Sequence, residues 1–232
     1  MSQPFAFDGE TVRLCTGNDP AIPRLQGHLR YIVAADLGSA KDPTGITIIE
    51  DRQLPMFQGV WRLGPRQRTL VWSDRLRQHR YTEIVDHLSA LLRREPMAGR
   101  VRLAIDASGV GRGVSDTLDL AGIRHVAVQM TAGSSVRRAG KFHNVSKQIL
   151  ITDLATALET GGLKMAADLP MRQELLMELE SFQTRTSASG VQVLDAGGAN
   201  NHADMAVSLA IGWFASEQLG GFVGEGQLEN WF

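Results

Sequence analysis

Three aspartates stand at the edges of apolar segments that lie far apart in the sequence. Asp36 and Asp106 each follow a short apolar run, and Asp204 precedes one. Each position is where a buried element meets solvent, so a compact fold can bring the three carboxylates together. Carboxylates that are a few ångströms apart in a partly dry site do not all stay ionised unless a proton or a cation neutralises them, and hard oxygen ligands favour Mg²⁺ or Mn²⁺. Together they predict a divalent-cation site, although any one of them alone is more typical of a strand end or a helix cap.

Composition places the chain among ordinary globular proteins. It has 232 residues, of which 43% are hydrophobic and 21% are charged, enough for one sizeable core. The formal net charge is -1, which excludes a globally basic nucleic-acid binder and leaves only local basic surface to contact phosphates. The single cysteine, Cys15, excludes an internal disulfide and suits a reducing compartment.

The sequence carries no evident targeting or membrane signal. Its start lacks the basic residues and continuous apolar stretch of a signal peptide, and no apolar segment approaches the roughly 18–20 residues needed to span a bilayer. We therefore expect a soluble, cytoplasmic protein that makes no membrane contact.

Apolar patterns predict one α/β domain over residues 30–218. Residues 1–29 have no sustained periodicity and are expected to form an N-terminal arm, and the glycine-rich segment 219–232 is expected to be a C-terminal tail. The first part of the domain has the β-rich runs typical of an antiparallel meander. These runs are residues 31–35, 46–49, 58–63 and 68–72.

The rest of the domain has a βαβ rhythm, which implies parallel strands joined by right-handed crossovers. Asn144 is expected to cap a helix that Gly161 terminates, and Pro170 to start the next helix. Helices are predicted over 81–94, 114–120, 144–160, 170–182 and 202–217, and strands over 101–105, 125–130, 163–165 and 191–194.

Three motifs in this pattern resemble the nuclease domain of phage large terminase subunits. They are Asp36-Leu-Gly38 at the end of the first strand, Ile105-Asp-Ala-Ser-Gly-Val-Gly111 after a later strand, and His202-Ala-Asp204 before the final helix. The resemblance covers about residues 30–216. It implies a ribonuclease H-like fold, in which helices flank a central mixed sheet made of an antiparallel meander followed by parallel strands.

The resemblance also assigns roles to the acidic residues. Asp36, Asp106 and Asp204 would be the catalytic, metal-binding cluster of a hydrolase that uses two Mg²⁺ or Mn²⁺ ions, with Asp36 bridging them. His202 would ligate a metal, shuttle a proton or orient a phosphate, while a solvent-facing histidine that starts a helix is an equally open interpretation. The implied function is cleavage of double-stranded DNA with low sequence specificity during phage-type genome packaging, in the cytoplasm of a bacterial host.

Two features depart from the family's pattern. Many relatives carry two adjacent aspartates after the histidine, whereas Ala203 replaces the first one here, which would weaken the hold on one cation. The chain also lacks G-x-x-x-x-G-K-[ST], the phosphate-binding loop of the packaging ATPase. A separate motor domain or subunit would therefore be a partner, together with the small terminase subunit and the portal.

Basic segments are candidates for contacts with duplex DNA. Arg137, Arg138, Lys141 and Lys147 form one basic stretch that is expected to bind phosphates, and a run of arginines over 62–80 is a weaker candidate. The alternative is that these charges are only solvated, as most charge runs are.

Other interpretations stay open at the level of sequence. Asp36-Leu-Gly-Ser39 also resembles the phosphate-loop aspartate of actin-like or sugar-kinase-like phosphotransferases, although such enzymes normally need a second related domain. A Holliday-junction resolvase has the same fold, and a DNA-binding scaffold that has lost cleavage would explain Ala203. Gly109-Val-Gly-Arg-Gly113 lacks the dinucleotide-binding spacing and either turns the backbone tightly or lets a phosphate approach.

Overall fold

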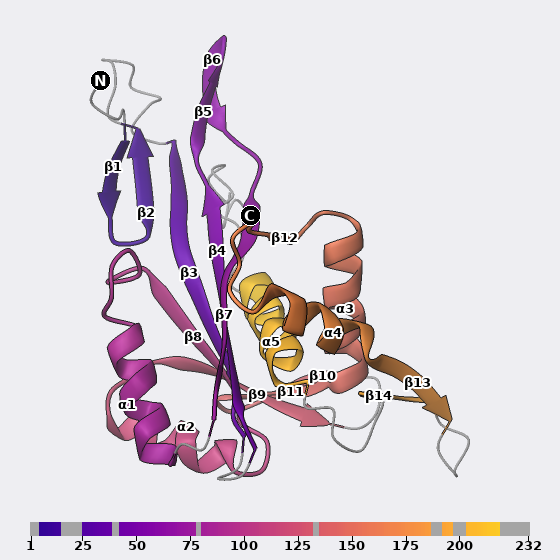
Figure 1. Cartoon of the computed structure of the whole chain (residues 1–232). Helices are drawn as coiled ribbons and strands as arrows, with labels where there is room; N and C mark the ends of the chain where they lie inside the picture. The colour runs from indigo at the N-terminus through magenta and orange to yellow at the C-terminus, as the bar shows by residue number, and fades with distance from the viewer. Residues whose placement is uncertain are drawn as a thin grey trace, which may run out of the picture.

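The computed structural model describes residues 5–14, 25–38, 42–77, 80–131, 135–186, 192–196 and 203–218, with the backbone alone for 183–186 and 192–196. Its centre is a ten-stranded mixed sheet with helices on both faces (Figure 1). None of the helices within these ranges combines the length and the apolar character required to cross a lipid bilayer.

The sheet joins an antiparallel meander to a set of parallel strands. Its strands are β1 (Phe5–Asp8), β2 (Thr11–Leu14), β3 (Gln26–Asp36), β4 (Thr44–Gln53), β7 (Gln67–Leu76), β8 (Val101–Asp106), β9 (His125–Thr131), β10 (Val136–Ala139), β11 (Phe142–Ser146) and β12 (Lys164–Met165). The order is β10-β11-β9-β8-β3-β4-β7-β12, and β2 joins the β1–β2 hairpin to β3. β3, β4 and β7 form the meander, whereas β3, β8, β9 and β11 run parallel. This topology confirms the expected mixed sheet.

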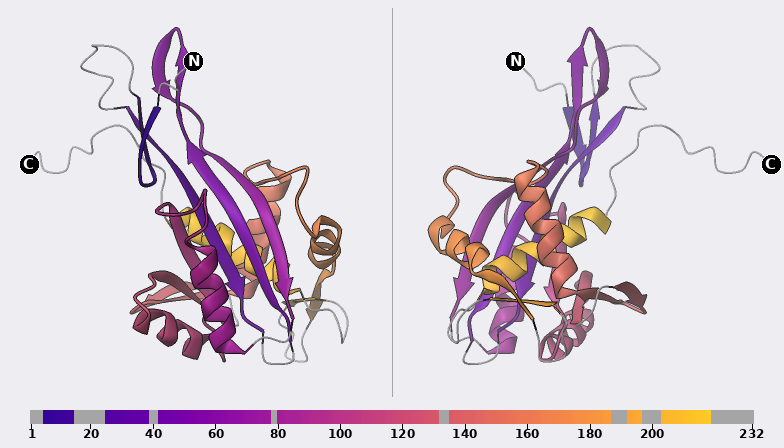
Figure 2. Two further views of the ribbon diagram at one scale, coloured as in Figure 1. Left: turned by 60° about the vertical axis from the view of Figure 1, so that its left-hand side comes forward. Right: turned by 90° about the vertical axis from the view of Figure 1, so that its right-hand side faces the viewer.

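Helices cover both faces of the sheet (Figures 1 and 2). On one face lie α1 (Tyr81–Leu91) and α2 (Gly111–Leu120), and on the other lie α3 (Lys147–Glu159), α4 (Arg172–Glu180) and α5 (Asp204–Gln218). Successive side chains of a strand point to opposite faces. On β3, Ile32 and Ala34 therefore pack in the core shared with α3, α4 and α5, while Val33 and Ala35 pack in the core shared with α1 and α2.

The helix α5 is buried on every side from Met205 to Ser216, because it is apolar around its whole circumference. Two contacts seat it on β3 and β4. Ser208 Oγ donates a hydrogen bond to Ala34 O and lies 2.9 Å from Thr47 Oγ1. Gly212 faces Ala34, whose Cβ would lie 3.1 Å from a methyl group placed on that glycine. The position of α5 along the sheet is therefore set by specific small and polar residues.

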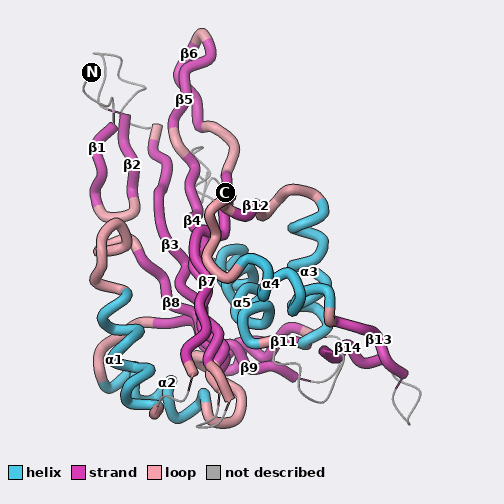
Figure 3. The backbone as a smooth tube through the Cα atoms, in the orientation of Figure 1, coloured by secondary structure: helices cyan, strands magenta, loops and turns pink. Residues whose placement is uncertain are grey.

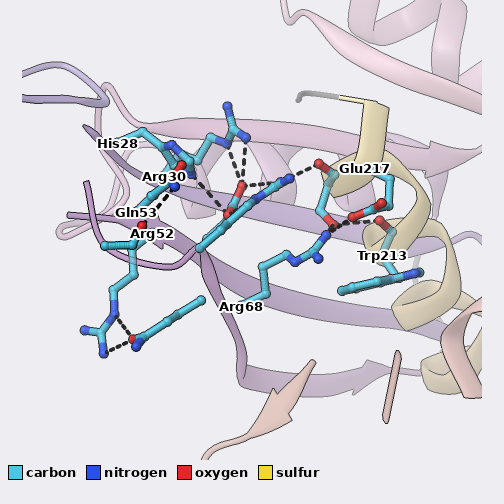
Figure 4. A network of polar contacts seen from close by, with 12 residues as sticks. His28, Arg30, Arg52, Gln53, Arg68, Trp213 and Glu217 are labelled. Carbon is cyan, nitrogen blue, oxygen red and sulfur yellow. Dashed lines mark hydrogen bonds and ion pairs between the residues drawn. The ribbon is translucent and has the colours of Figure 1, made fainter. Parts of the chain in front are cut away.

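A buried ion cluster holds the far end of α5 (Figure 4). Asp51 on β4 accepts hydrogen bonds from Arg30 Nε at 2.8 Å and from Arg66 Nε at 2.7 Å, and His28 Nε2 lies 3.1 Å from it. Burial alone would raise the pKa of Asp51, but the hydrogen bonds from His28 and Arg66 hold this pKa well below its usual range. Arg66 also donates to Ser216 O at 2.6 Å, so the cluster ties the last turn of α5 to the sheet.

Two local expectations are wrong. The sequence predicts an irregular arm before Arg30, but residues 5–14 form the β1–β2 hairpin that extends the main sheet (Figure 3). Asn144 is predicted to cap a helix, but it lies within β11, and α3 begins at Lys147. Pairing of β11 with β9 and burial of Val145 in the core outweigh the local capping preference of asparagine.

Two short hairpins lie outside the main sheet. They are formed by β5 (Pro55–Gln58) with β6 (Val60–Leu63), and by β13 (Phe182–Thr186) with β14 (Gln192–Ala196). The first projects beyond the end of the meander (Figures 1 and 2). The predicted strand over 58–63 therefore belongs to this hairpin, and β7 is the third strand of the meander.

Candidate metal centre

Asp36 and Asp106 are the last residues of two neighbouring parallel strands. The pairing of β3 with β8 reaches Ala35 opposite Ile105, so the two aspartates come next along the strands. Both side chains point to the face covered by α5, because the residues two positions earlier on each strand belong to that core. Parallel pairing thus brings two carboxyl groups together at one edge of the sheet.

Asp204 reaches the same edge from the first turn of α5. Its backbone lies against Gly45, and Gly45 pairs with Asp36 across β3 and β4. A methyl group on Gly45 would overlap the carbonyl group of Asp204 and would lie 2.6 Å from Met205 N. The absence of a side chain at Gly45 therefore lets α5 begin directly over the strand next to Asp36.

The carboxyl groups of Asp106 and Asp204 perturb that of Asp36. Burial raises the pKa of Asp36 well above its usual range, and the negative charges of Asp106 and Asp204 raise it further. A hydrogen bond between Asp36 and Asp106 also raises the pKa of Asp36 and lowers that of Asp106. Burial also raises the pKa of Asp106, which is only 7% exposed. Such a group of like charges favours the binding of a proton or a cation.

Two further residues orient or offset this negative charge. Ser108 N donates to Asp106 Oδ1 at 2.8 Å, and Ser108 Oγ accepts a hydrogen bond from Met130 N at 2.8 Å, which ties the loop after β8 to β9. Lys147 begins α3 at the end of β11, which runs parallel to β9. Burial raises the pKa of both Asp36 and Asp106, and the positive charge of Lys147 acts in the opposite direction with a smaller effect. Lys147 is thus a cation of the carboxylate site itself.

The carboxyl groups are neighbours without forming a ready-made coordination shell. Within the described ranges, no group of three or more histidine, cysteine, aspartate or glutamate side chains has the arrangement needed to hold a metal ion. Asp36 and Asp106 are instead hydrogen-bonded to each other, a contact that a bound cation would replace. His202, the fourth predicted catalytic residue, lies outside the described residues.

The remaining predicted DNA contacts have different surroundings. Arg137 and Arg138 are exposed on β10, the edge strand nearest β11. Lys141 Nζ donates to Asp116 Oδ1 at 2.8 Å and to Asp119 Oδ2 at 2.5 Å. Two carboxylates therefore compete with any phosphate for Lys141, whereas the side chains of Arg137 and Arg138 reach solvent.

Of the six arginines between positions 62 and 80, Arg62, Arg77 and Arg80 are exposed, and the other three are engaged inside the protein. Their ion pairs are Arg66 with Asp51, Arg68 with Glu217, and Arg75 with Glu178. Arg68 also stacks on Trp213, 3.9 Å from its ring centroid, and burial together with the charge of Arg66 lowers the pKa of Arg68 to about 10. These side chains stabilise the contact of α4 and α5 with the sheet.

Sequence reasoning assigned no role to Gly45, Ser108 and Glu178, which help to build the site. Ser108 follows Asp106 by two residues, a spacing at which an aspartate commonly bonds the backbone ahead of it, so this signal was present. Gly45 and Glu178 act on the start of α5, which is more than 25 residues away in the sequence from either, as the positions 45, 178 and 204 show. Only the folded arrangement reveals these two contacts.

Comparison by sequence gives no relative for this chain. No protein-family model matches it. A search of curated proteins likewise finds no match.

Comparison by structure gives a consistent set of neighbours. The large terminase nuclease of thermophilic phage G20c has a TM-score of 0.56 at 23% sequence identity, over 91% of each chain. The large terminase nuclease domain of Thermus phage P74-26 has a TM-score of 0.55 at 22% identity, over 90% of this chain and 87% of the other. The nuclease domain of the large terminase subunit of bacterial virus Sf6 has a TM-score of 0.52 at 16% identity, over 79% of this chain and 87% of the other.

The fold is therefore of the ribonuclease H-like α/β class, with a central mixed sheet flanked by helices. Within that class, the chain has the fold of phage large terminase nuclease domains, as its three motifs predict.

Proposed function

We propose that this chain is a divalent-metal-dependent endonuclease that cleaves double-stranded DNA with low sequence specificity during phage-type genome packaging. One observation carries the proposal. Asp36, Asp106 and Asp204 meet at one edge of a terminase-nuclease fold, where burial and mutual repulsion raise the pKa of Asp36.

Bound ions in the structural neighbours support the use of a metal. The G20c nuclease has been solved with bound magnesium and with bound cobalt, and the Sf6 nuclease domain with manganese. The three carboxylates of this chain offer the hard oxygen ligands that Mg²⁺ and Mn²⁺ prefer. Asp36, Asp106 and Asp204 would hold two ions, with Asp36 as the ligand that both ions share. Such ions would lower the pKa of an attacking water and stabilise the leaving oxygen.

The other residues of the site would bind and orient the substrate. Ser108 fixes the carboxylate of Asp106 through its backbone amide. Lys147, next to the carboxylates, would contact the phosphate that is cut, and Arg137 and Arg138 would bind phosphates farther along the duplex. Because phosphate contacts carry no sequence information, low specificity follows. His202 stays a candidate for proton transfer or phosphate contact.

The biological setting is part of the same proposal. The sequence contains no phosphate-binding loop of the P-loop type, so an ATPase motor domain or subunit would supply the energy of packaging. The small terminase subunit and the portal would be further partners, and the activity would take place in the cytoplasm of a bacterial host.

The test is cleavage of supercoiled plasmid in Mg²⁺ or Mn²⁺. We expect the wild type to cut, a chelator to stop the reaction, and Asp36→Asn to be inactive. Asp153→Asn, which makes the same chemical change at an exposed position of α3, should cut like the wild type. Equal cutting by Asp36→Asn and the wild type would refute the proposed mechanism.

The same assay separates the rival functions. Preferential cutting of four-way junctions over linear duplex would indicate a resolvase. Intact plasmid together with retained DNA binding would indicate a scaffold without cleavage, which Ala203 favours. Ala203 is buried in the core beneath the start of α5, so the chain has no second carboxylate at that position.

A further inference from the structure

We propose that Glu178 is a positioning residue for the metal site: it holds the first turn of α5, and with it Asp204, level with Asp36. This inference rests on the proposed function. Glu178 lies on α4, at a distance in sequence from every predicted site residue, and the sequence alone gives it no role in the site.

Glu178 is a buried carboxylate with a defined set of partners. It is 3% exposed. Its Oε2 accepts a hydrogen bond from Ala206 N at 2.9 Å, the amide of Met205 is a second backbone donor, and its Oε1 pairs with Arg75 Nη2. Burial raises the pKa of Glu178, while these donors act in the opposite direction. Because both oxygens are engaged by the protein, Glu178 is a support for the site rather than a further ligand.

The partners of Glu178 are the amides that α5 cannot satisfy by itself. The first amides of a helix have no carbonyl partner within the helix, and a side-chain oxygen usually caps them. Here the residue before the helix is Ala203, whose side chain carries no acceptor. Glu178 supplies the acceptor from another helix, and its charge also suits the positive end of the helix dipole. The amides that it holds directly follow Asp204, so their position determines where the Asp204 carboxylate lies.

The strand pairing connects this support to the rest of the site. Gly45 pairs with Asp36 on one side and with Arg75 on the other, so these three residues form one row across β3, β4 and β7. The backbone of Asp204 lies on Gly45, and the carboxylate of Glu178 is bound to Arg75. Arg75 thus fixes Glu178, Glu178 fixes the start of α5, and Gly45 leaves the room in which Asp204 approaches Asp36.

The test is the binding of Mn²⁺ to the metal-free protein, measured by isothermal titration calorimetry. Glu178→Gln removes the charge that faces Arg75 and leaves one acceptor for two amides. We expect Mn²⁺ affinity to fall about tenfold, at the low end of what loss of a supporting residue costs a metal site. Arg75→Gln should lower it in the same direction, and the double variant should lose less than the sum of the two single effects, because both changes break one linked contact.

The matched control lies at the other end of the same helix. Glu217→Gln makes the same chemical change in the ion pair with Arg68. We expect it to change thermal stability and to leave the Mn²⁺ affinity within twofold of the wild type. Circular dichroism on every variant separates loss of folding from loss of binding, and Arg75→Gln carries the test if Glu178→Gln does not fold.

The outcomes distinguish this inference from the proposed function. If Asp36→Asn loses Mn²⁺ binding while folded Glu178→Gln and Arg75→Gln bind like the wild type, Glu178 has no positioning role and only this inference is overturned. If Asp36→Asn binds Mn²⁺ and cuts DNA like the wild type, the proposed function has failed and the inference fails with it.

Discussion

Replacing Gly45 with alanine should separate Asp204 from Asp36 without removing any carboxylate. The added methyl group would overlap the backbone carbonyl of Asp204 and lie 2.6 Å from Met205 N, where ordinary contact begins at 3.4 Å. The start of α5 must therefore move by about 0.8 Å or more, the difference between these two distances. Neither neighbour is a flexible side chain that can rotate away, since all three atoms belong to the backbone.

The cost should appear in both stability and cleavage. Overpacking of this kind costs about 1–3 kcal/mol of folding free energy. A displacement close to 1 Å in a catalytic group costs about 10²-fold in rate, so the initial rate of plasmid cleavage in Mn²⁺ should fall by about that factor. Denaturant unfolding and plasmid nicking at a temperature where the variant is fully folded measure the two effects.

Gly162→Ala is the matched control for Gly45→Ala. A methyl group at Gly162 would make only ordinary contacts, the nearest being Ala157 O at 3.5 Å, and this glycine lies on the same side of the sheet. Its cleavage rate should equal that of the wild type. If Gly45→Ala cuts as fast as Gly162→Ala, the seating of α5 on Gly45 does not position a catalytic group.

Three further predictions concern charge. Because the pKa of Asp36 is raised in the folded, metal-free protein, the free energy of unfolding should fall as pH rises above the ordinary aspartate pKa. Asp36→Asn should make this fall shallower without abolishing it, since the pKa values of Asp106 and Glu178 are raised as well, and it should raise the melting temperature at neutral pH, as calorimetry across pH can check. Asp51→Asn leaves Arg30 and Arg66 buried without their full counter-charge and should destabilise the fold by about 3–5 kcal/mol in chemical denaturation, a loss that a surface change such as Asp153→Asn should not reproduce. Replacing Arg137 and Arg138 by alanine should reduce the slope of log affinity for DNA against log salt concentration by about two. Lys141→Ala should change this slope less, because Asp116 and Asp119 already bind that lysine. A larger change from Lys141→Ala than from the arginine replacements would contradict this assignment.

The sequence predicted the elements whose patterns are local. The apolar run before Asp36 and the alternation of strands and helices after residue 80 identified the mixed sheet. The spacing of apolar residues along a strand or a helix directly reflects which of its faces are buried. The same alternation implies parallel strands, and neighbouring parallel strands end at the same edge of a sheet. Asp36 and Asp106 come together for this reason, since each is the last residue of its strand.

The errors and omissions have non-local causes. Asn144 has a strong local preference for a helix cap, yet pairing with β9 makes its segment a strand. The β1–β2 hairpin has short strands whose stability depends on pairing with β3. Such short strands do not show a sustained alternation of apolar and polar residues from which they could be predicted. The support of Asp204 by Glu178 joins β7, α4 and α5, and a single sequence contains no pattern from which such a three-way contact follows.

The most direct measurement for the central claim is a crystal of the protein soaked in Mn²⁺ and recorded for anomalous scattering. We expect anomalous density between Asp36, Asp106 and Asp204, and its loss in crystals of Asp36→Asn soaked in the same way. Density at other sites with none between these three carboxylates would contradict the assignment of this edge of the sheet as the metal centre.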